Sequence, residues 1–336
     1  MLQEYAGVPV LVLGASGFIG RWVARLLTRA GARLYLPARD CSTAKRTFTE
    51  FDIKGELLKL NLLETGITQR MIAEINPAIT FNLAGYGIDR SECSEDLAFA
   101  INGRLPEILC EAISLTSVRG WTGQRMVHAG TAMEYGAVSG DLKETSRARP
   151  TTLYGRSKLA GTEAIGSVCR RGSLAGVTAR LFSVYGPGES HARLLPSLIA
   201  ETKGSAPITL TEGRHKRDFT YVEDVAEGLI RLGVAGCRPG EVVNVATGSL
   251  TSIRSFVRLA SRELNIRNER LHFGALPTRS EEMDHDPVNC ERLLELTSWQ
   301  PRTGLVGGVR KTINFRQSER AALSAVRLNQ TLCELF

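Results

Sequence analysis

The feature that most constrains the fold is a glycine-rich turn near the start of the chain, between a strand pattern and a helical pattern. Residues 10–13 form a short apolar run, the length of a buried parallel strand, and the run ends at Gly14. Apolar residues then return at helical spacing over 22–27. Gly14 can take the tight turn, Gly17 leaves room for a pyrophosphate beside the backbone, and Gly20 lets the helix lie close to the sheet. This order predicts a dinucleotide site whose phosphates rest on the helix N-terminus.

Composition and charge narrow the class of protein. An apolar share of 43% with 23% charged residues is ordinary for a soluble globular protein, and no run approaches the roughly 18 apolar residues of a membrane span. The first residues do not resemble a secretory signal. The seven cysteines are scattered and never form a CxxC pair, so we expect no disulfide framework, no metal site and a reducing, cytoplasmic location. The net charge of +7 is mixed with acidic residues, which favours an anionic small-molecule substrate over nucleic acid.

Two further segments carry residues suited to proton transfer. Tyr154 and Lys158 stand four positions apart, so they share one face of a predicted helix. A nearby ammonium favours the phenolate, so we expect Lys158 to lower the pKa of Tyr154 from its usual value of about 10. Tyr154 could then exchange a proton with a substrate oxygen. Thr131 ends an expected strand, and its hydroxyl could donate to a carbonyl oxygen. Taken singly, these residues could equally be a solvated helix face and a small residue at a turn.

The GxxGxxG spacing of the first turn, the YxxxK pair and Thr131 together resemble the extended short-chain dehydrogenase/reductase family. That family includes nucleotide-sugar epimerases, dehydratases and ketoreductases. The resemblance covers roughly residues 8–315 and implies an NAD(P)-dependent enzyme of the short-chain dehydrogenase type that acts on a nucleotide sugar. It also implies a homodimer, formed through the helices that carry Asn102 and Tyr154.

The fold implied by the resemblance is α/β: a Rossmann doubly wound parallel sheet with a smaller C-terminal substrate-binding lobe. The expected Rossmann domain comprises 1–187 and 219–258, the lobe 188–218 and 259–315, and an extra C-terminal helix 316–336. The expected strands lie within 10–13, 33–40, 57–62, 79–85, 126–136, 177–188 and 242–246, and the expected helices include 95–115 and 253–264.

The second strand bears on the choice of cofactor. In NAD-using epimerases of this family, an acidic residue binds the ribose at the position that Ala38 occupies here. Arg39 matches the arginine of members that use NADP, so we expect NADP(H), with NAD(H) as the alternative. The other possibility is that Arg39 merely ends the strand while Asp40 contacts the ribose. The resemblance implies cofactor contacts from Gly14, Ser16, Gly17, Phe18, Ile19, Gly20, Arg39, Asn61, Leu62, Leu83, Ala84, Gly85, Asn102, Tyr154, Lys158, Leu181, Ser183 and Val184.

The resemblance also implies where a nucleotide-diphosphate sugar would bind. Arg217 lies in a segment that matches the family pattern G-x-x-x-R-D-F/Y-x-x-V-x-D, and arginine suits bidentate capture of a diphosphate. Without the family match, this segment would be interpreted as a basic surface turn. Asp218 and Asp224 are expected to be structural, Asp224 as a helix cap. The implied substrate-binding residues are Thr131, Ala132, Met133, Ser183, Arg193, Arg217 and Arg279.

The residues after Thr131 separate the reactions that this family performs. Sugar 4,6-dehydratases carry acidic residues there, whereas Ala132 and Met133 cannot move a proton, so elimination is not expected. The E-Y-G sequence at 134–136 resembles 4-keto-6-deoxy-sugar reductases. Together with Arg39, it predicts an NADPH-dependent reductase of a nucleotide-activated 4-keto-6-deoxy sugar, an enzyme of deoxysugar biosynthesis. The alternatives are a nucleotide-sugar epimerase, a reductase of a non-sugar ketone and a non-catalytic NADP-binding sensor.

Overall fold

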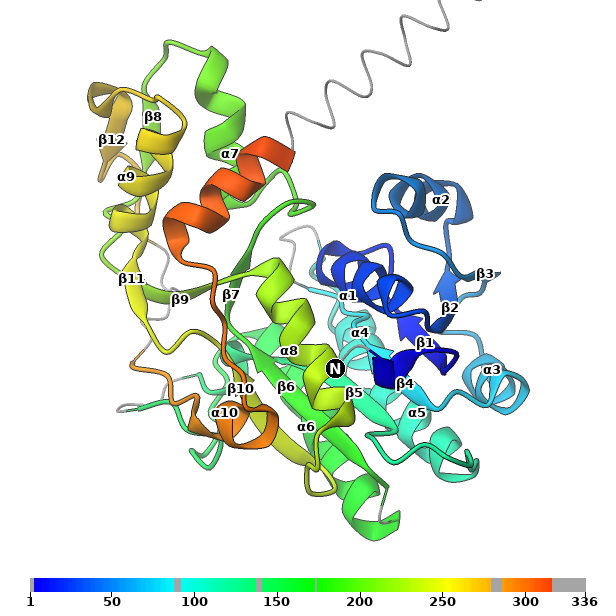
Figure 1. Cartoon of the computed structure of the whole chain (residues 1–336). Coiled ribbons are helices and arrows are strands. Elements are labelled where there is room, and N and C mark those ends of the chain that lie inside the picture. Colours follow the sequence, from blue (N-terminus) through cyan, green and yellow to red (C-terminus); the bar gives the residue numbers. More distant parts are fainter. Residues whose placement is uncertain (1–2, 88–91, 137–140, 173, 279–285, 316–336) are drawn as a thin grey trace, which may run out of the picture.

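The computed structural model describes residues 3–87, 92–136, 141–172, 174–278 and 286–315. Arg279 and the helix expected over 316–336 therefore lie outside the described residues. Seven strands form one parallel sheet at the centre of the molecule (Figure 1). The predicted α/β class and parallel sheet are confirmed. In order across the sheet, the strands are β10 (Glu241–Val245), β6 (Gly176–Leu181), β5 (Met126–Thr131), β4 (Ile79–Asn82), β1 (Pro9–Leu13), β2 (Arg33–Ala38) and β3 (Glu56–Lys59).

The strand order reverses once, beside β1. The chain runs outward from β1 to β2 and β3, then returns to the other side of β1 as β4 and continues through β5 and β6. In open parallel sheets, ligands bind beyond the carboxyl ends of the strands at such a reversal. The topology thus predicts a binding groove where β1 and β4 end, at Leu13 and Asn82.

Helices cover both faces of the sheet, and the alternation of side chains along β1 follows these two layers. Val10 and Val12 pack into the cluster that contains Trp22, whereas Leu11 and Leu13 pack into the cluster on the opposite face. The helices on the Trp22 side are α1 (Phe18–Arg29), α2 (Cys41–Glu50), α8 (Val222–Val234) and α10 (Glu291–Thr297), and those on the opposite side are α3 (Ile67–Ile75), α5 (Leu105–Ser114) and α6 (Leu153–Gly172).

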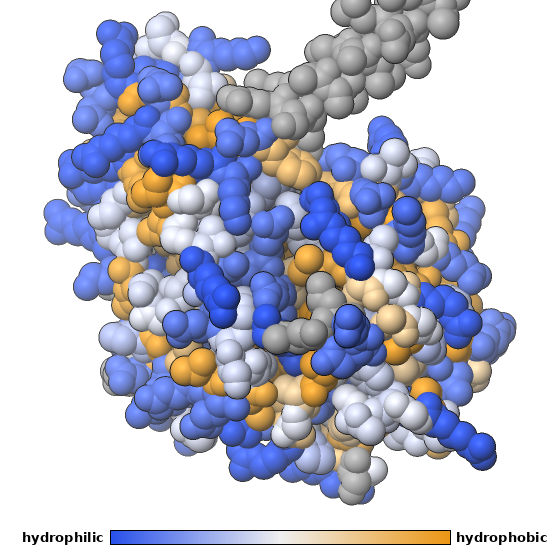
Figure 2. Space-filling model, in the orientation of Figure 1, coloured by the Kyte–Doolittle hydropathy of each residue, from blue (hydrophilic) through white to orange (hydrophobic). Residues whose placement is uncertain are grey.

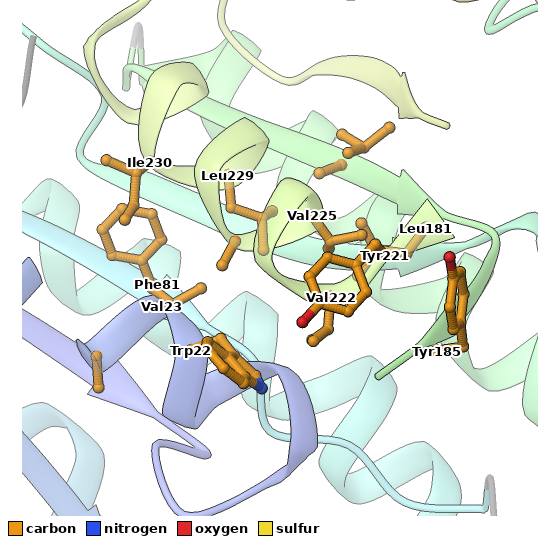
Figure 3. Close-up of a cluster of buried hydrophobic side chains, with 14 of the residues drawn as sticks. Trp22, Val23, Phe81, Leu181, Tyr185, Tyr221, Val222, Val225, Leu229 and Ile230 are labelled. Carbon is orange, nitrogen blue, oxygen red and sulfur yellow. The ribbon is translucent and has the colours of Figure 1, made fainter. Parts of the chain in front are cut away.

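The packing of α1 against α8 joins the beginning of the chain to residues two hundred positions later. Figure 3 shows Trp22 and Val23 of α1 facing Val222 and Val225 of α8, with all four side chains buried. The Trp22 indole also donates a hydrogen bond of 2.9 Å to the Pro187 carbonyl. Burying a side chain of this size contributes about 1.5–3 kcal/mol, so the contact fixes α1, and with it the glycine turn, on the sheet.

A smaller lobe lies beyond the carboxyl-end side of β6 and β10 (Figure 1). The chain enters it after β6 and again after β10, and a helix over 305–315 packs beside it. Its elements are a sheet of β11 (Leu250–Ser252), β9 (Lys216–Tyr221) and β7 (Ser183–Tyr185), a second sheet of β12 (Leu271–Phe273) and β8 (Ile208–Leu210), and the helices α7 (Leu194–Ala200) and α9 (Ile253–Glu263).

Two sequence-based expectations about helices are corrected. The helix expected over 95–115 is α4 (Glu95–Ala98), a π-helix (Phe99–Arg104) and then α5. A π-turn inserts an extra residue, so positions four apart on either side of it no longer share one helix face: Leu97 is 38% exposed although Leu105 is buried.

Asp224 is structural, as predicted, but it is not the helix cap. Helix α8 begins at Val222, so Asp224 lies inside its first turn. Its carboxylate accepts hydrogen bonds from the backbone N–H groups of Arg302 (3.0 Å) and Thr303 (2.7 Å). Asp224 therefore ties α8 to the segment that leads into the helix over 305–315. The helix expected over 253–264 is α9, and Ser252 caps it, because the Ser252 hydroxyl accepts a hydrogen bond from the Ser255 N–H.

The visible surface is mixed in character. Figure 2 shows hydrophilic residues spread over the face of Figure 1, with hydrophobic residues in small patches between them. Within the described ranges, no helix has both the length and the apolar composition needed to cross a lipid bilayer.

Candidate active site

Two adjoining cavities follow the carboxyl ends of the strands, at the reversal of strand order. They share Gly17 and the 83–85 loop that follows β4, so they form one groove. Gly14 has a φ of +76°, and a Cβ there would lie 2.6 Å from the Leu83 carbonyl oxygen. A Cβ on Gly20 would overlap the Gly14 carbonyl oxygen. The predicted tight turn and the predicted close approach of α1 are both confirmed.

The first cavity, of about 290 Å³, lies between β1, β2 and the segment after β3. Arg39 is exposed at its edge, next to Ala38. Asp40 does not line it, because its carboxylate is the N-cap of α2 and accepts from the N–H groups of Ser42 (2.9 Å) and Thr43 (3.1 Å). The hydroxyls of Thr43 (2.6 Å) and Ser42 (2.7 Å) also donate to this carboxylate, and they, more than the N–H groups, hold the pKa of Asp40 below its usual range. Nine predicted cofactor residues line this cavity: Gly14, Ser16, Gly17, Arg39, Asn61, Leu62, Leu83, Ala84 and Gly85.

The second cavity, of about 310 Å³, brings together Thr131, Tyr154 and Lys158. Thr131 ends β5, and the two other residues face it from the first turns of α6. Helix α6 can approach this closely because Gly155 packs against the Met133 carbonyl oxygen, which a Cβ at that position would approach to 2.5 Å. The Thr131 side chain lies near enough to the Tyr154 phenol to act on its pKa. The remaining predicted residues that line this cavity are Phe18, Ile19, Gly20, Leu181, Val184 and Arg193.

The ionisation of this site differs from the expectation based on the YxxxK spacing. The pKa of Tyr154 is raised, chiefly because burial disfavours the phenolate and also because the carboxylate of Glu134 lies nearby. Arg193 and the Thr131 side chain oppose this shift without cancelling it. The predicted lowering of the Tyr154 pKa is therefore wrong for this structure. Tyr154 stays protonated near neutral pH, which suits a proton donor.

The pKa of Lys158 is also shifted from its usual value. Its side chain is 2% exposed, and burial lowers its pKa to about 8, against the opposing effect of Glu134. The Nζ atom of Lys158 lies 3.3 Å from Nε2 of His128, whose own pKa is well below its usual value because of burial and the neighbouring Lys158. His128 is therefore neutral, and the ammonium of Lys158 brings a positive charge to the second cavity, which Arg193 also lines.

Glu134 is a buried carboxylate that the sequence interpretation did not place in the site. It forms an ion pair of 2.9 Å with Arg180, and the two side chains are 0% and 5% exposed. Its oxygens also accept from the Thr131 N–H (2.8 Å) and the Thr162 hydroxyl (3.1 Å). The bond to Thr131 completes a capping box over the short 3-10 helix Ala132–Glu134. Glu134 thus holds the end of β5, and the Thr131 hydroxyl with it, in one position.

Some predicted site residues lie elsewhere. Asn102 lines neither cavity: its amide is buried and bonds the backbone of Tyr86 and the Ser157 hydroxyl. Arg217 lies on β9, outside both cavities, and donates to the Lys216 carbonyl. The other predicted residues that line neither cavity are Ala132, Met133 and Ser183. The second cavity also has lining residues that the sequence interpretation missed: Tyr86, Ala129, Gly130, Phe182, Glu189 and Ser190.

Comparison with known proteins agrees with this geometry. Residues 10–246, which include the glycine turn, Thr131 and the Tyr154–Lys158 pair, match the NAD dependent epimerase/dehydratase family. The chain belongs to this family. Membership confirms the predicted resemblance to the extended short-chain dehydrogenase/reductases and the prediction of an NAD(P)-dependent enzyme.

Relatives of this family member include dTDP-6-deoxy-L-talose 4-dehydrogenase (NAD(P)(+)) of Kitasatospora kifunensis, 29% identical over 91% of this chain and 95% of the relative. CDP-abequose synthase of Salmonella muenchen is 24% identical over 92% of this chain and 98% of the relative. Among solved structures, MoeE5 in complex with UDP-glucuronic acid and NAD is 25% identical, with a TM-score of 0.79 over 92% of this chain and 99% of the other. Epimerase Mth375 from Methanothermobacter thermautotrophicus shares the fold, with a TM-score of 0.83, 21% identity and coverage of 96% of both chains.

Proposed function

We propose that this protein is an NADPH-dependent reductase of a nucleotide-activated 4-keto-6-deoxy sugar. The observation that carries the proposal is the pairing of a complete Thr131, Tyr154 and Lys158 set with Ala132 and Met133, which offer no acid or base for elimination. Relatives whose names describe a dTDP-6-deoxy-L-talose 4-dehydrogenase and a CDP-abequose synthase support a 6-deoxy sugar nucleotide as the substrate class.

The groove fits a dinucleotide. Gly14, Gly17 and Gly20 line the groove with bare backbone, and a Cβ on any of them would press on the Leu83 or Gly14 carbonyl of the turn. Arg39 at the edge of the first cavity supports a 2′-phosphate and hence NADP(H). Asp40 is occupied as a helix cap, which weakens the NAD(H) alternative.

The proposed chemistry follows from the second cavity. When bound, the cofactor supplies the hydride that reduces the keto carbon. Tyr154, which burial keeps protonated, gives its proton to the keto oxygen, while Thr131 donates a hydrogen bond to the same oxygen. Lys158 would hold the nicotinamide ribose, and Arg193 at the cavity wall would face the diphosphate of the substrate. Arg217 and Arg279 remain proposed diphosphate ligands.

The deciding experiment incubates the protein with NADPH and a panel of nucleotide-linked 4-keto-6-deoxy sugars and follows the absorbance of NADPH. Continuous oxidation is expected. Sugar inversion without net cofactor use would make the protein an epimerase, the second candidate, which is supported by relatives such as the dTDP-L-rhamnose 4-epimerase of Burkholderia thailandensis (25% identical). Binding of NADPH without turnover of any sugar would instead identify a sensor.

Two variants test the assigned residues. Tyr154→Phe should abolish turnover and leave NADPH affinity within about twofold, whereas the control Tyr35→Phe, outside the second cavity, should keep turnover. Arg39→Asp should shift preference toward NAD, whereas Arg46→Asp on the exposed face of α2 makes the same charge change away from the groove. An unchanged NADP/NAD ratio in Arg39→Asp would refute the cofactor assignment.

We further propose a cytoplasmic homodimer assembled through the π-helix, α5 and α6. The proposed domains are those expected from the sequence, with 1–187 and 219–258 binding the cofactor and 188–218 and 259–315 binding the sugar. Light scattering of the purified full chain would test the dimer.

A further inference from the structure

A buried polar chain runs under the catalytic helix and ends at Lys158. Asn82 and His128 are direct partners in the register of β4 and β5, so their side chains lie side by side on the face that α6 covers. Nδ2 of Asn82 and Nδ1 of His128 are 3.1 Å apart, and Nε2 of His128 is 3.3 Å from Nζ of Lys158. Asn82 and His128 are fully buried. Neither has a part in the proton and hydride transfer proposed above.

The polar atoms of this chain can be paired in only two ways. If the Asn82 amide nitrogen donates to Nδ1, then a neutral His128 carries its proton on Nε2 and needs an uncharged amine on Lys158 to accept it. This arrangement leaves Oδ1 of Asn82 buried without a hydrogen-bond partner among the described residues. If the amide is turned, Oδ1 accepts from Nδ1–H, and the bare Nε2 accepts from the Lys158 ammonium. The second pattern gives both ring nitrogens of His128 and the Lys158 ammonium a partner, and it places Nδ2 of Asn82, in place of Oδ1, where no partner is found among the described residues.

We propose that His128 is a positioning residue for Lys158: Asn82 holds its imidazole as the Nδ1–H tautomer, and Nε2 accepts a hydrogen bond from the buried ammonium. The pair thereby keeps Lys158 charged and aimed into the second cavity, although no carboxylate of the described residues bonds its amine directly. The role of Lys158 itself rests on the proposed function, but its protonation can be measured without turnover.

Other charged groups near the amine do not replace this acceptor. The groups described around it are Tyr154, one turn earlier on α6, and Glu134, whose carboxylate favours the ammonium from a distance. The oxygens of Glu134 are already bonded to Thr131, Thr162 and Arg180. Arg193 and Glu92 act on the Tyr154 phenol. His128 is thus the described side chain whose free lone pair faces Nζ at hydrogen-bonding distance.

The test is NMR of the full-length protein labelled with ¹³C,¹⁵N-lysine and ¹⁵N-histidine, with the Lys158 and His128 signals assigned by Lys158→Arg and His128→Gln. At pH 7, the ¹⁵N shifts should show a proton on Nδ1 and none on Nε2 of His128, and Lys158 should titrate near pH 8. A proton on Nε2 at pH 7, with Lys158 charged, would overturn the proposal.

Three variants test whether His128 acts as a hydrogen-bond acceptor for Lys158 or only fills space. His128→Leu removes the acceptor, so the Lys158 pKa should fall by about one unit or more, because a hydrogen bond to the charged form is lost. His128→Gln places an amide oxygen at similar reach and should restore most of that shift. Thr80→Val, on β4 two residues before Asn82, removes a buried hydroxyl outside this chain and should leave the titration unchanged.

If Lys158 has the same pKa in His128→Leu as in the unsubstituted protein, the proposed role of His128 is refuted. If His128→Leu does not fold, as judged by circular dichroism, the tautomer measured in the unsubstituted protein decides instead. Where turnover is detected, the alkaline fall of kcat/KM in His128→Leu should move to lower pH by the same amount. The titrations need no substrate. A protein without reductase activity could therefore still show the expected Lys158 titration, and an active one could fail to show it, so the two proposals are tested separately.

Discussion

The ion pair of Glu134 and Arg180 offers the sharpest test of how this site is held together. In Glu134→Gln, one carbonyl oxygen must replace two carboxylate oxygens that serve Thr131, Thr162 and Arg180. The positive charge of Arg180, only 5% exposed, then loses its counter-charge. Removing one partner of a buried pair costs about 3–5 kcal/mol, because the remaining charge stays buried and uncompensated. We expect the free energy of unfolding of Glu134→Gln to fall by that amount.

Urea unfolding, followed by circular dichroism at pH 7, measures this loss. The matched control is Glu227→Gln, which breaks an Arg231 pair on α8 whose glutamate is 40% exposed. An exposed pair of this kind contributes about 0–1 kcal/mol. A change in Glu134→Gln no larger than in Glu227→Gln would refute the argument that burial makes the first pair important.

A double-mutant cycle checks the cause. In Glu134→Leu with Arg180→Leu neither charge of the pair is left buried, so this double variant should be less destabilised than the sum of its single variants by at least about 1 kcal/mol. Glu134 also raises the pKa values of Tyr154 and Lys158. Its removal should therefore move the Lys158 titration to below pH 8, and an unmoved titration would mean that the carboxylate acts on this site through structure alone.

Three further predictions follow from packing, capping and burial. Gly20→Ala places a methyl group against the Gly14 carbonyl and should lower the free energy of unfolding in urea by about 1–3 kcal/mol. The control Gly172→Ala, with open space around it, should change that free energy by less than about 1 kcal/mol. Equal losses in the two variants would contradict the packing argument. Ser252→Ala removes the N-cap of α9 and should lower the free energy of unfolding by about 1 kcal/mol in the same assay. An unchanged midpoint of urea unfolding would show that the cap does not stabilise the protein. The folded-state pKa of His128 lies below its unfolded value of 6.5, so the unfolded chain binds more protons and stability should fall as pH drops below about 6.5. This fall should be smaller in His128→Gln. Equal dependence of stability on pH in the two proteins would refute the contribution of His128.

Much of the fold could be predicted because it follows from local patterns. The apolar runs over β1, β2 and β10, the glycine turn and the helix α9 depend on neighbours within a few residues. The π-helix over Phe99–Arg104 could not be predicted, because an inserted residue leaves the composition and approximate spacing of a helix unchanged. The expected Asp224 cap failed for a similar reason: its true partner, Thr303, is 79 residues away.

The candidate site likewise has features that the sequence could predict and features that it could not. Thr131, Tyr154 and Lys158 were found because their spacing matches a known pattern, and the groove does bring them together. The raised pKa of Tyr154 was missed because burial cannot be read from the YxxxK spacing. A lone charge in each of two apolar strand segments, Glu134 and Arg180, was a signal that could have indicated a buried pair.

The order of strands in the sheet has a consequence for synthesis of the chain. The outer neighbour of β6 is β10, which begins at Glu241, about sixty residues after β6 ends. A ribosome that has released residues up to about 185 thus presents a hydrophobic strand with one unpaired edge, and such edges recruit other chains. Nascent chains halted between β6 and β10 should accordingly be the aggregation-prone and chaperone-bound species, and release of β10 should end that interval.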